Sequence, residues 1–437
     1  MMAQWEACKK AAGNAVLLFR MGDFYEAFYE DAALISKELE LTLTKRQEIP
    51  MSGVPHHTCE TYIDKLVSKG YRVAIAEQTE DPKKAKGLVK REIARVVTPG
   101  TLISSSLLSD KANNFFACIT QVNSLFGLAV LDLTTSDFLI TEFDREQDLL
   151  NELHRLRPSE ILVSHKFHQK HKALLEDVHK TYDFLSTLQD DWRFEHQTAC
   201  EFLLTHFKVK SLDGFGLKGN VAAINAAGGL LNYIQNTLSL NINHINRIQN
   251  YSTSNFMSLD RATQRNLELT ESLQDGSRRN TLLQLLDKTC TPMGARLLRH
   301  WIKQPLLDPI EIAVRQDSIQ AFLNHPALLT ELNDSLEKVR DLERIMMRIS
   351  SGYASPRDLV ALRLSLEPMP ALKALLQSLA YDSTLIAQEE EKLNPLPAVV
   401  ELLATALVDD PPLRVSDGNI FRNGYCQELD DLREVSS

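Results

Sequence analysis

Two side chains near the start of the chain, Phe24 and Glu26, could act together on a nucleic acid. The ring of Phe24 could enter a groove of a duplex as a wedge, because apolar side chains inserted between base steps unstack them. The carboxylate of Glu26 could accept a hydrogen bond from a base edge. The alternative is that Phe24 and Tyr25 belong to the protein core and Glu26 only caps a helix.

A second group of residues offers positive charge in predicted loops. These candidates are Lys45, Arg46, Lys83, Lys84 and Lys86. Contacts to phosphate oxygens position a protein on DNA without specifying a sequence, and solvated surface is the alternative for each cation. The first hundred residues hold 15 Lys and Arg against 14 Asp and Glu, whereas the remainder holds 33 against 44. Charge therefore favours the first hundred residues as the place for a phosphate backbone.

The remaining reactive residues do not predict catalysis. His165, His168 and His171 are spaced by three, which drifts around a helix, and no carboxylate completes a zinc site, so we interpret them as exposed polar surface. Asp132 is the one carboxylate suitably placed on a predicted strand, whereas a magnesium-dependent nuclease needs several. The sequence contains no GxxxxGK[ST] phosphate loop. We expect no catalytic residue, no metal ion and no cofactor in this chain.

The element that must position Phe24 and Glu26 is predicted to be a helix. The apolar run at residues 16–19 predicts a short buried strand. Asp23 then qualifies as a helix N-cap, with Glu26 three residues later as in a capping box. Apolar residues recur at helical spacing from position 28 to position 39. Phe24 and Glu26 would accordingly lie on the first helical turn, at its positive end.

The rest of the first hundred residues continues this mixed α/β pattern. Thr58 can cap a helix that Gly70 ends. Between the first helix and Thr58 we expect an alternating strand and then a loop that holds two Pro and a Gly. The predicted elements are a strand at 39–44, a loop at 47–58, a helix at 58–69 and strands at 71–77 and 90–97.

Three strands at hairpin spacing follow a Ser-rich linker at residues 101–112. After them the pattern predicts a helix, a short strand and further helices. Strand-strand-strand-helix-strand-helix is the order of the ribonuclease H-like fold. The predicted elements are strands at 113–121, 126–133 and 137–143, a helix at 144–156 and a strand at 160–163.

Helical periodicity dominates from residue 219 onward. The predicted helices cover residues 222–238, 278–303, 311–324, 326–349 and 357–379, before a Pro-rich break at 409–412. The predicted fold class is therefore a multidomain α/β plus all-α protein.

Bulk composition narrows the class of protein further. The length of 437 residues predicts two to four domains, and 44% hydrophobic with 24% charged residues is ordinary for a globular protein. No run of 18 apolar residues is present, so we expect no membrane span. Six cysteines are spread singly, which is typical of a reduced cytoplasmic protein. The net charge of -10 argues against a generally basic nucleic-acid binder.

Eight sequence stretches closely resemble the bacterial MutS family of DNA mismatch-repair proteins. MGDFYE followed by AFYEDA resembles the family's mismatch-recognition motif, and IPMSGVPHH and TEDP with VVTPGT match at corresponding places. SLDRATQRNLEL, TPMGARLL, VRDLERIMMRI and SPRDLVAL resemble the family's core, or lever, domain. The resemblance covers essentially the whole chain.

The resemblance implies three domains and a set of partners. They are a mismatch-recognition domain at 1–100, a ribonuclease H-like connector at 113–240 and a helical core or lever domain at 241–437 that is incomplete at its end. In the family, the Phe and Glu of FYE touch the mispaired base, and they fall on Phe24 and Glu26. The implied partners are double-stranded DNA with mismatches or small loops, a MutL-like factor that contacts the connector, and a second copy in the full-length protein. ATP and Mg²⁺ are expected only in the full-length family protein, which is a DNA-dependent ATPase, and we expect this chain to be an N-terminal part.

We expect recognition to depend on deformability, because a mispair costs less to kink than a well-stacked pair. Two functions of other classes remain open. The chain could be a protein-interaction scaffold without DNA preference, which gel shifts on matched and G·T duplexes would reveal. It could also be a ribonuclease H-like nuclease, which a Mg²⁺-dependent cleavage assay would reveal.

Overall fold

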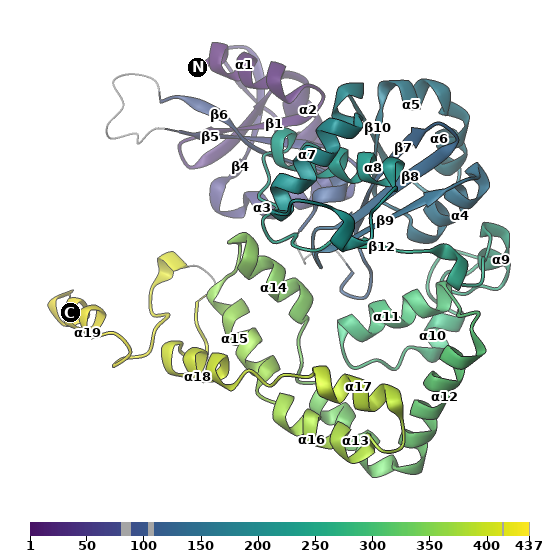
Figure 1. Ribbon diagram of the computed structural model, residues 1–437. Coiled ribbons are helices and arrows are strands. Elements are labelled where there is room, and N and C mark those ends of the chain that lie inside the picture. Colours follow the sequence, from purple (N-terminus) through teal and green to yellow (C-terminus); the bar gives the residue numbers. More distant parts are fainter. Residues whose placement is uncertain (80–88, 104–108, 413–414, 437) are drawn as a thin grey trace. The chain divides into compact units, whose positions relative to one another are not determined.

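A computed structural model describes residues 1–79, 89–103, 109–412 and 415–436 (Figure 1). The chain forms two compact units. Unit 1 comprises residues 1–109 and 113–251, and unit 2 comprises residues 110–112 and 252–437. Unit 1 holds two six-stranded sheets, whereas unit 2 is helical. This content agrees with the predicted class of mixed α/β plus all-α structure.

The first sheet of unit 1 has the strand order β3-β4-β2-β1-β5-β6. Strands β1 and β5 run parallel, and the other neighbours run antiparallel. The strands are β1 Val16–Met21, β2 Phe24–Phe28, β3 Thr44–Arg46, β4 Ile49–Pro55, β5 Val73–Gln78 and β6 Arg91–Val97.

Three helices cover the two faces of this sheet (Figure 1). Helix α1 (Met2–Ala12) places Trp5 and Cys8 against one face, in a cluster with Phe19. Helices α2 (Tyr29–Leu39) and α3 (Cys59–Ser68) pack their apolar residues against the other face. The sheet is therefore buried on both sides over most of its area, as its apolar central strand requires.

The prediction that Phe24 and Glu26 begin a helix is wrong. They lie in strand β2, which forms a hairpin with β1, and the helix begins only at Tyr29. Gly22 makes the hairpin possible because it occupies the first position of the two-residue turn with φ +59°, a conformation that Gly adopts without steric cost. Asp23 is the second turn residue and not a helix cap.

The predictions for residues 39–58 also need correction. Residues 39–43 are not a strand, because helix α2 extends to Leu39 and Glu40 closes it in the left-handed conformation. The predicted loop at 47–58 instead contains β4, which pairs with β2 on one side and with β3 on the other. The prediction failed because Pro50 and Pro55 suggested a loop. Their missing N–H groups are tolerated at the ends of β4.

The second sheet of unit 1 has the strand order β11-β10-β7-β8-β9-β12. The three predicted hairpin strands are confirmed, and so are the next helix and strand; β11 was not predicted. The strands are β7 Phe115–Val122, β8 Leu125–Asp132, β9 Asp137–Phe143, β10 Glu160–Ser164, β11 Leu185–Gln189 and β12 Gln249–Asn250. The helices that accompany this sheet are α4 Glu146–Leu156, α5 His165–Lys170, α6 Lys172–His179, α7 His196–Phe207 and α8 Val221–Asn232. Helix α8 continues into a π-helical turn, Tyr233–Thr237, close to the predicted end at residue 238.

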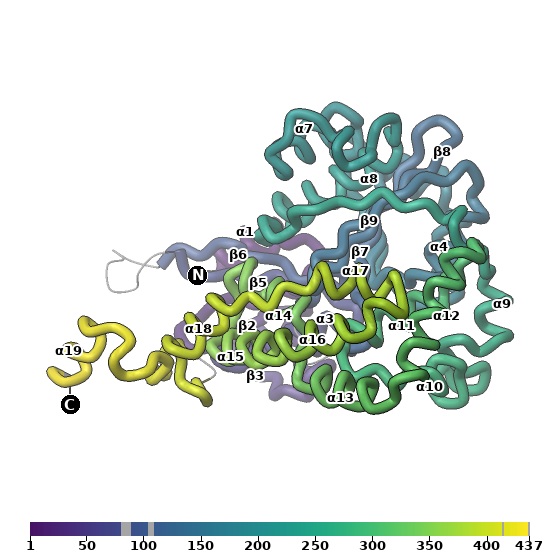
Figure 2. Tube along the Cα trace, turned by 60° about the horizontal axis from the view of Figure 1, so that its bottom comes forward, coloured from purple at the N-terminus to yellow at the C-terminus, as the bar shows by residue number. Residues whose placement is uncertain are grey.

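Unit 2 is built from short helices that follow one another along the chain (Figure 2). Three predicted helices are each split in two, because the chain turns at residues 287–291, 337–341 and 367–368. The helices are α9 Arg261–Asn266, α10 Leu282–Leu286, α11 Pro292–Lys303, α12 Pro309–Asn324, α13 Pro326–Leu336, α14 Leu342–Ser351, α15 Pro356–Leu366, α16 Met369–Leu379, α17 Thr384–Lys392, α18 Pro397–Ala406 and α19 Gln427–Ser436.

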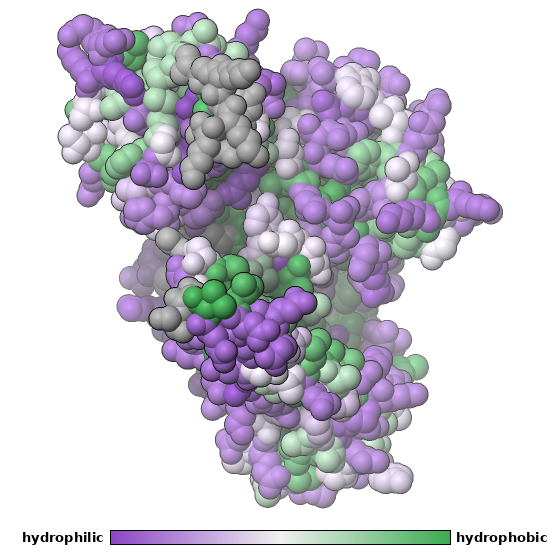
Figure 3. All heavy atoms as spheres, turned by 90° about the vertical axis from the view of Figure 1, so that its left-hand side faces the viewer, coloured by the Kyte–Doolittle hydropathy of each residue, from purple (hydrophilic) through white to green (hydrophobic). Residues whose placement is uncertain are grey.

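Hydrophilic residues predominate on the face drawn in Figure 3, and its hydrophobic areas are small and separate. No helix within the described ranges combines the length and the hydrophobicity that crossing a bilayer requires.

Candidate nucleic-acid interface

Phe24 and Glu26 share one face of strand β2, because alternate residues of a strand point to the same side. The intervening Tyr25 points to the opposite side, where it is buried with Ala27. The Phe24 side chain is 48% exposed, an unusual position for a large aromatic residue. The strand thus presents an aromatic ring and a carboxylate side by side, which the predicted helical turn would not have done.

Phe24 is exposed because helix α1 covers the middle of this sheet face and not the tip of the β1–β2 hairpin. On the same face, Phe19 and Phe28 are fully buried in the cluster with α1. Met21 pairs with Phe24 at the tip of the hairpin and is only partly buried. Burial therefore falls from the middle of the hairpin toward its tip, and the apolar face emerges into solvent at Phe24.

Glu26 is more enclosed than Phe24. It lies between Phe19 of β1 and Gly53 of β4, and its side chain is 15% exposed. Burial raises the pKa of Glu26, because a carboxylate loses hydration there, and the Arg46 guanidinium opposes this rise. Arg46 Nη1 lies 3.5 Å from Glu26 Oε2. Glu26 is thus an enclosed carboxylate with one cationic neighbour.

Gly53 is the neighbour that keeps this carboxylate accessible from the β4 side. A Cβ atom at position 53 would lie 3.4 Å from Glu26 Cγ and 3.0 Å from the Tyr25 carbonyl oxygen. A side chain at position 53 would therefore crowd the Tyr25 carbonyl oxygen and come into van der Waals contact with Glu26. The IPMSGVPHH motif supplies this Gly at the place where β4 passes Glu26.

Tyr25 anchors the β1–β2 hairpin on the sheet face opposite to Phe24 and Glu26. Its hydroxyl donates a hydrogen bond to Glu77 of β5, and the Arg20 guanidinium lies 5.3 Å from its ring centre. The His56 ring is 5.8 Å away. The alternative that Phe24 and Tyr25 are both core residues and Glu26 caps a helix holds for Tyr25 alone, because Phe24 is exposed and Glu26 lies in a strand. The contacts of Tyr25 fix the strand that carries Phe24 and Glu26.

The predicted phosphate-contacting cations are described only in part. Lys45 and Arg46 lie on β3, the edge strand of the sheet, and both are exposed. Lys45 is 3.5 Å from Glu48, and Arg46 reaches Glu26 on the other face. The other three predicted cations lie outside the described residues: Lys83, Lys84 and Lys86.

Asp132, the strand carboxylate weighed as a nuclease ligand, has a structural role. It is fully buried and accepts hydrogen bonds from the Asn113 side chain, the Asn114 N–H and both the N–H and the hydroxyl of Thr134. Its oxygens fix the turn after β8 and the start of β7. Within the described residues, no group of three His, Cys, Asp or Glu side chains is placed to hold a metal ion.

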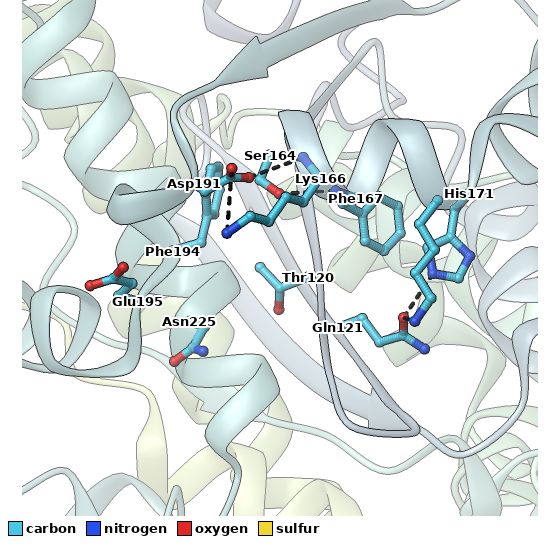
Figure 4. A pocket seen from close by; sticks show the side chains of 11 residues that line it. Thr120, Gln121, Ser164, Lys166, Phe167, His171, Asp191, Phe194, Glu195 and Asn225 are labelled. Atoms are coloured by element: carbon cyan, nitrogen blue, oxygen red, sulfur yellow. Dashed lines mark hydrogen bonds and ion pairs between the residues drawn. The ribbon is translucent and has the colours of Figure 1, made fainter.

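A hollow opens at the carboxyl ends of the parallel strands β7, β10 and β11 (Figure 4). Thr120, Lys166 and Asp191 line it, and the ammonium of Lys166 points toward Asp191. His171 closes one end, with Nε2 2.8 Å from Gln121 Oε1. Its side chain is only 10% exposed, so its interpretation as exposed surface is wrong. Such carboxyl edges are common binding places in α/β sheets.

Comparisons with known proteins point to one family along the chain. Family models described as MutS domain I, MutS domain II and MutS domain III match residues 1–106, 114–246 and 262–435. A DNA mismatch repair protein MutS from Protochlamydia amoebophila is 61% identical and covers 100% of this chain. The protein of that name from Chlamydia pneumoniae is 47% identical and covers 99%. The chain spans 51% and 53% of these two relatives, about half of their length.

Proposed function

Because the chain belongs to the MutS family, we propose that it recognises mispaired or unpaired bases in double-stranded DNA. The observation that carries the proposal is the exposed Phe24 beside the enclosed Glu26 on one face of the β1–β2 hairpin. An exposed aromatic ring on an anchored strand can stack on a base without first being freed from a core.

In the proposed mechanism, Phe24 enters from the minor groove and stacks on a base that its partner holds weakly. Stacking on an aromatic side chain is worth about 1–3 kcal/mol per base. Glu26 then forms a hydrogen bond with that base. Selection rests on the bend, because a mispair resists kinking less than a matched pair. One aromatic residue gives modest discrimination, so we assign further fidelity to ATP-driven steps of the full-length protein.

The test compares G·T and matched duplexes by fluorescence anisotropy. Phe24→Ala is expected to remove the preference for G·T, while much of the affinity for matched DNA remains, because phosphate contacts are separate from the wedge. Tyr381→Ala is the control, since Tyr381 is a fully exposed aromatic residue of unit 2. An equal loss on both duplexes after Phe24→Ala would contradict the wedge role.

The ATPase activity, ATP, Mg²⁺ and the homodimer belong in this proposal to the full-length family protein. The 437-residue sequence holds no phosphate-binding loop of the GxxxxGK[ST] type. We place the protein in the bacterial cytoplasm at the nucleoid, where its proposed DNA substrate is found.

We also propose that the connector, residues 113–240, docks a MutL-like repair factor. The support is the exposed Trp192, which directly follows the hollow-lining Asp191 in the sequence and has the Arg193 guanidinium 4.9 Å from its ring centre. Trp and Arg are enriched among residues that dominate binding energy at interfaces. Trp192→Ala should weaken capture of a purified MutL by this chain and leave DNA binding unchanged. Unchanged capture would remove the assignment of this surface.

A further inference from the structure

Arg46 and Glu26 form an ion pair. The candidate roles given above are different for the two residues, a phosphate contact for Arg46 and a base contact for Glu26. Arg46 lies on the edge strand β3, and Glu26 lies two strands away on β2. Between them passes β4, whose Gly53 pairs with Glu26 and places no side chain beside it. The Arg46 side chain is 48% exposed and that of Glu26 is 15% exposed. The pair therefore forms at the solvent boundary of the candidate interface.

A carboxylate at this place opposes DNA binding. Glu26 carries negative charge on the surface that the duplex phosphates would approach, and like charges repel. Its enclosed position weakens screening by water, so the repulsion would be larger than for a surface carboxylate. Arg46 is the cation that the structure places against this charge.

The geometry of Arg46 leaves donors for a second anion. Its contact with Glu26 uses Nη1, while Nε and Nη2 make no hydrogen bond within the described part of the chain. A guanidinium presents five N–H donors in a planar fork and can hold two acceptors at once, which a Lys ammonium does less specifically. Because the Arg46 side chain is 48% exposed and its contact with Glu26 is as long as 3.5 Å, the guanidinium can shift toward a second acceptor at little cost.

We propose that Arg46 is a positioning residue that bridges Glu26 and a backbone phosphate of the bound duplex. The inference deepens the proposed function and rests on it. The bridge makes a carboxylate tolerable beside DNA and ties the placement of Glu26 to engagement of the backbone. Arg46 acts through Glu26 and does not itself read a base.

Lys45 provides a matched control. It is the neighbouring cation on the same edge strand, but its side chain points to the opposite face and pairs with Glu48 at 3.5 Å. A phosphate contact by Lys45 would therefore be independent of Glu26. The two cations differ in their link to Glu26 while sharing strand, exposure and sign of charge.

The test is a double-mutant cycle on the 437-residue chain, read as the affinity for matched duplex at fixed low salt. Arg46→Ala should weaken binding about tenfold, because it removes a phosphate contact and leaves Glu26 uncompensated. Adding Glu26→Gln to Arg46→Ala should recover affinity about threefold or more beyond the effect of Glu26→Gln alone, as expected for residues in contact. Lys45→Ala and Glu26→Gln should combine additively. Arg46→Lys should retain affinity for matched duplex better than Arg46→Ala and lose part of the G·T preference.

If the effects of Arg46→Ala and Glu26→Gln on affinity are additive, as expected for Lys45→Ala and Glu26→Gln, the bridge is overturned. Arg46 would then be an ordinary phosphate contact. A titration of the Glu26 carboxyl by ¹³C NMR reads the pair without DNA, and its pKa should rise in Arg46→Ala. An unchanged pKa would also count against the proposal. If the parent chain shows no G·T preference while the coupling on matched DNA persists, the mismatch function fails and the bridge stands.

Discussion

Glu26 combines opposing requirements at the scale of a single residue. As a carboxylate it can only accept a hydrogen bond, and its burial makes the charged form costly, while Arg46 lowers that cost. It pairs with Phe19 of β1 and Gly53 of β4, and its side chain is 15% exposed. The residue is thus suited to a fixed contact with a base.

Glu26→Gln is expected to weaken discrimination between G·T and matched duplex. The amide keeps the shape and removes the like charge near phosphates, so affinity for matched duplex should stay the same or rise. The measurement is the ratio of the two dissociation constants by anisotropy. If the variant binds every duplex like the parent, Glu26 serves only the packing of the hairpin.

His244 predicts a pH dependence of stability for unit 1. Burial lowers the pKa of His244 to about 4, with a smaller contribution from the neighbouring His206, against about 6.5 in an unfolded chain. The unfolded chain therefore binds the proton more readily between these values, and stability is lost as the pH falls from 6.5 toward 4. The loss from this group at pH 5, relative to pH 7.5, should be about 2 kcal/mol.

Urea unfolding at both pH values measures this loss, with Trp301→Phe as the background so that the remaining tryptophans report unit 1. In that background His244→Leu should flatten the pH dependence, whereas the exposed His165→Gln should not. An unchanged pH dependence in His244→Leu would show that other groups cause it.

At the scale of elements, the β3–β4 hairpin carries backbone strain next to the candidate interface. Its two turn residues, Gln47 and Glu48, both have positive φ, at 49° and 67°. This pattern belongs to type I′ turns, which favour Asn-Gly. The left-handed conformation costs roughly 1–2 kcal/mol for a residue with a Cβ atom. The strand that presents Arg46 is therefore held by a turn with unfavourable residues.

The double change Gln47→Asn with Glu48→Gly is expected to raise the free energy of unfolding of unit 1 by about 1 kcal/mol. The exposed Lys45–Glu48 pair that it removes contributes little. Urea unfolding gives the value, and Asn123→Gly in the β7–β8 turn is a control that should change little, because Asn tolerates its φ of 55°. Lower stability in the turn variant would mean that Gln47 or Glu48 makes a stabilising contact.

Helix segmentation in unit 2 follows from capping and from a buried charge network. Asp341 caps α14 and also receives two hydrogen bonds from Arg296, whose side chain is 5% exposed. Arg296 and Arg344 in turn donate to residues 110–112, which belong to unit 2 although they precede the second sheet of unit 1. Removing one partner of such a buried network is costly, because it leaves a buried charge unpaired.

At the scale of the whole molecule, charge limits how strongly the chain can hold DNA. The net charge is -10, and residues 101–437 carry 33 Lys and Arg against 44 Asp and Glu. We therefore expect phosphate contacts to come from a few cations of the first hundred residues, such as Lys45 and Arg46. We expect the chain to bind DNA weakly. In the full-length protein, we expect other parts to contribute most of the affinity for the DNA backbone.

The salt dependence of binding tests this expectation. Each neutralised phosphate contributes a slope of about -0.9 in log K against log salt, so about three engaged cations predict a slope near -3. The dissociation constant of a G·T duplex at physiological salt should be micromolar or weaker. Anisotropy from low to physiological salt measures both quantities. Nanomolar affinity or a slope steeper than about -6 would show that this chain itself supplies most of the affinity for DNA.

The sequence by itself determined the elements whose signals are local. Alternation and turn residues predicted β7, β8 and β9, and helical spacing with Gly70 predicted α3. The motifs also placed the chain in its family, whereas the roles that they suggest for Phe24 and Glu26 stay predictions. The predictions of these elements and of the family succeeded because they depend on patterns among neighbouring residues.

Only the tertiary structure decided how the candidate interface is built. The FYEAF segment fits the start of a helix in sequence, yet pairing with β1 and β4 makes it a strand, because contacts with distant residues override local preference. The same pairing exposes Phe24 beside Glu26 and places Gly53, which has no side chain, next to Glu26. Arg46 meets Glu26 across twenty residues of sequence. No local pattern encodes that meeting, because it depends on the order of β3, β4 and β2 in the sheet.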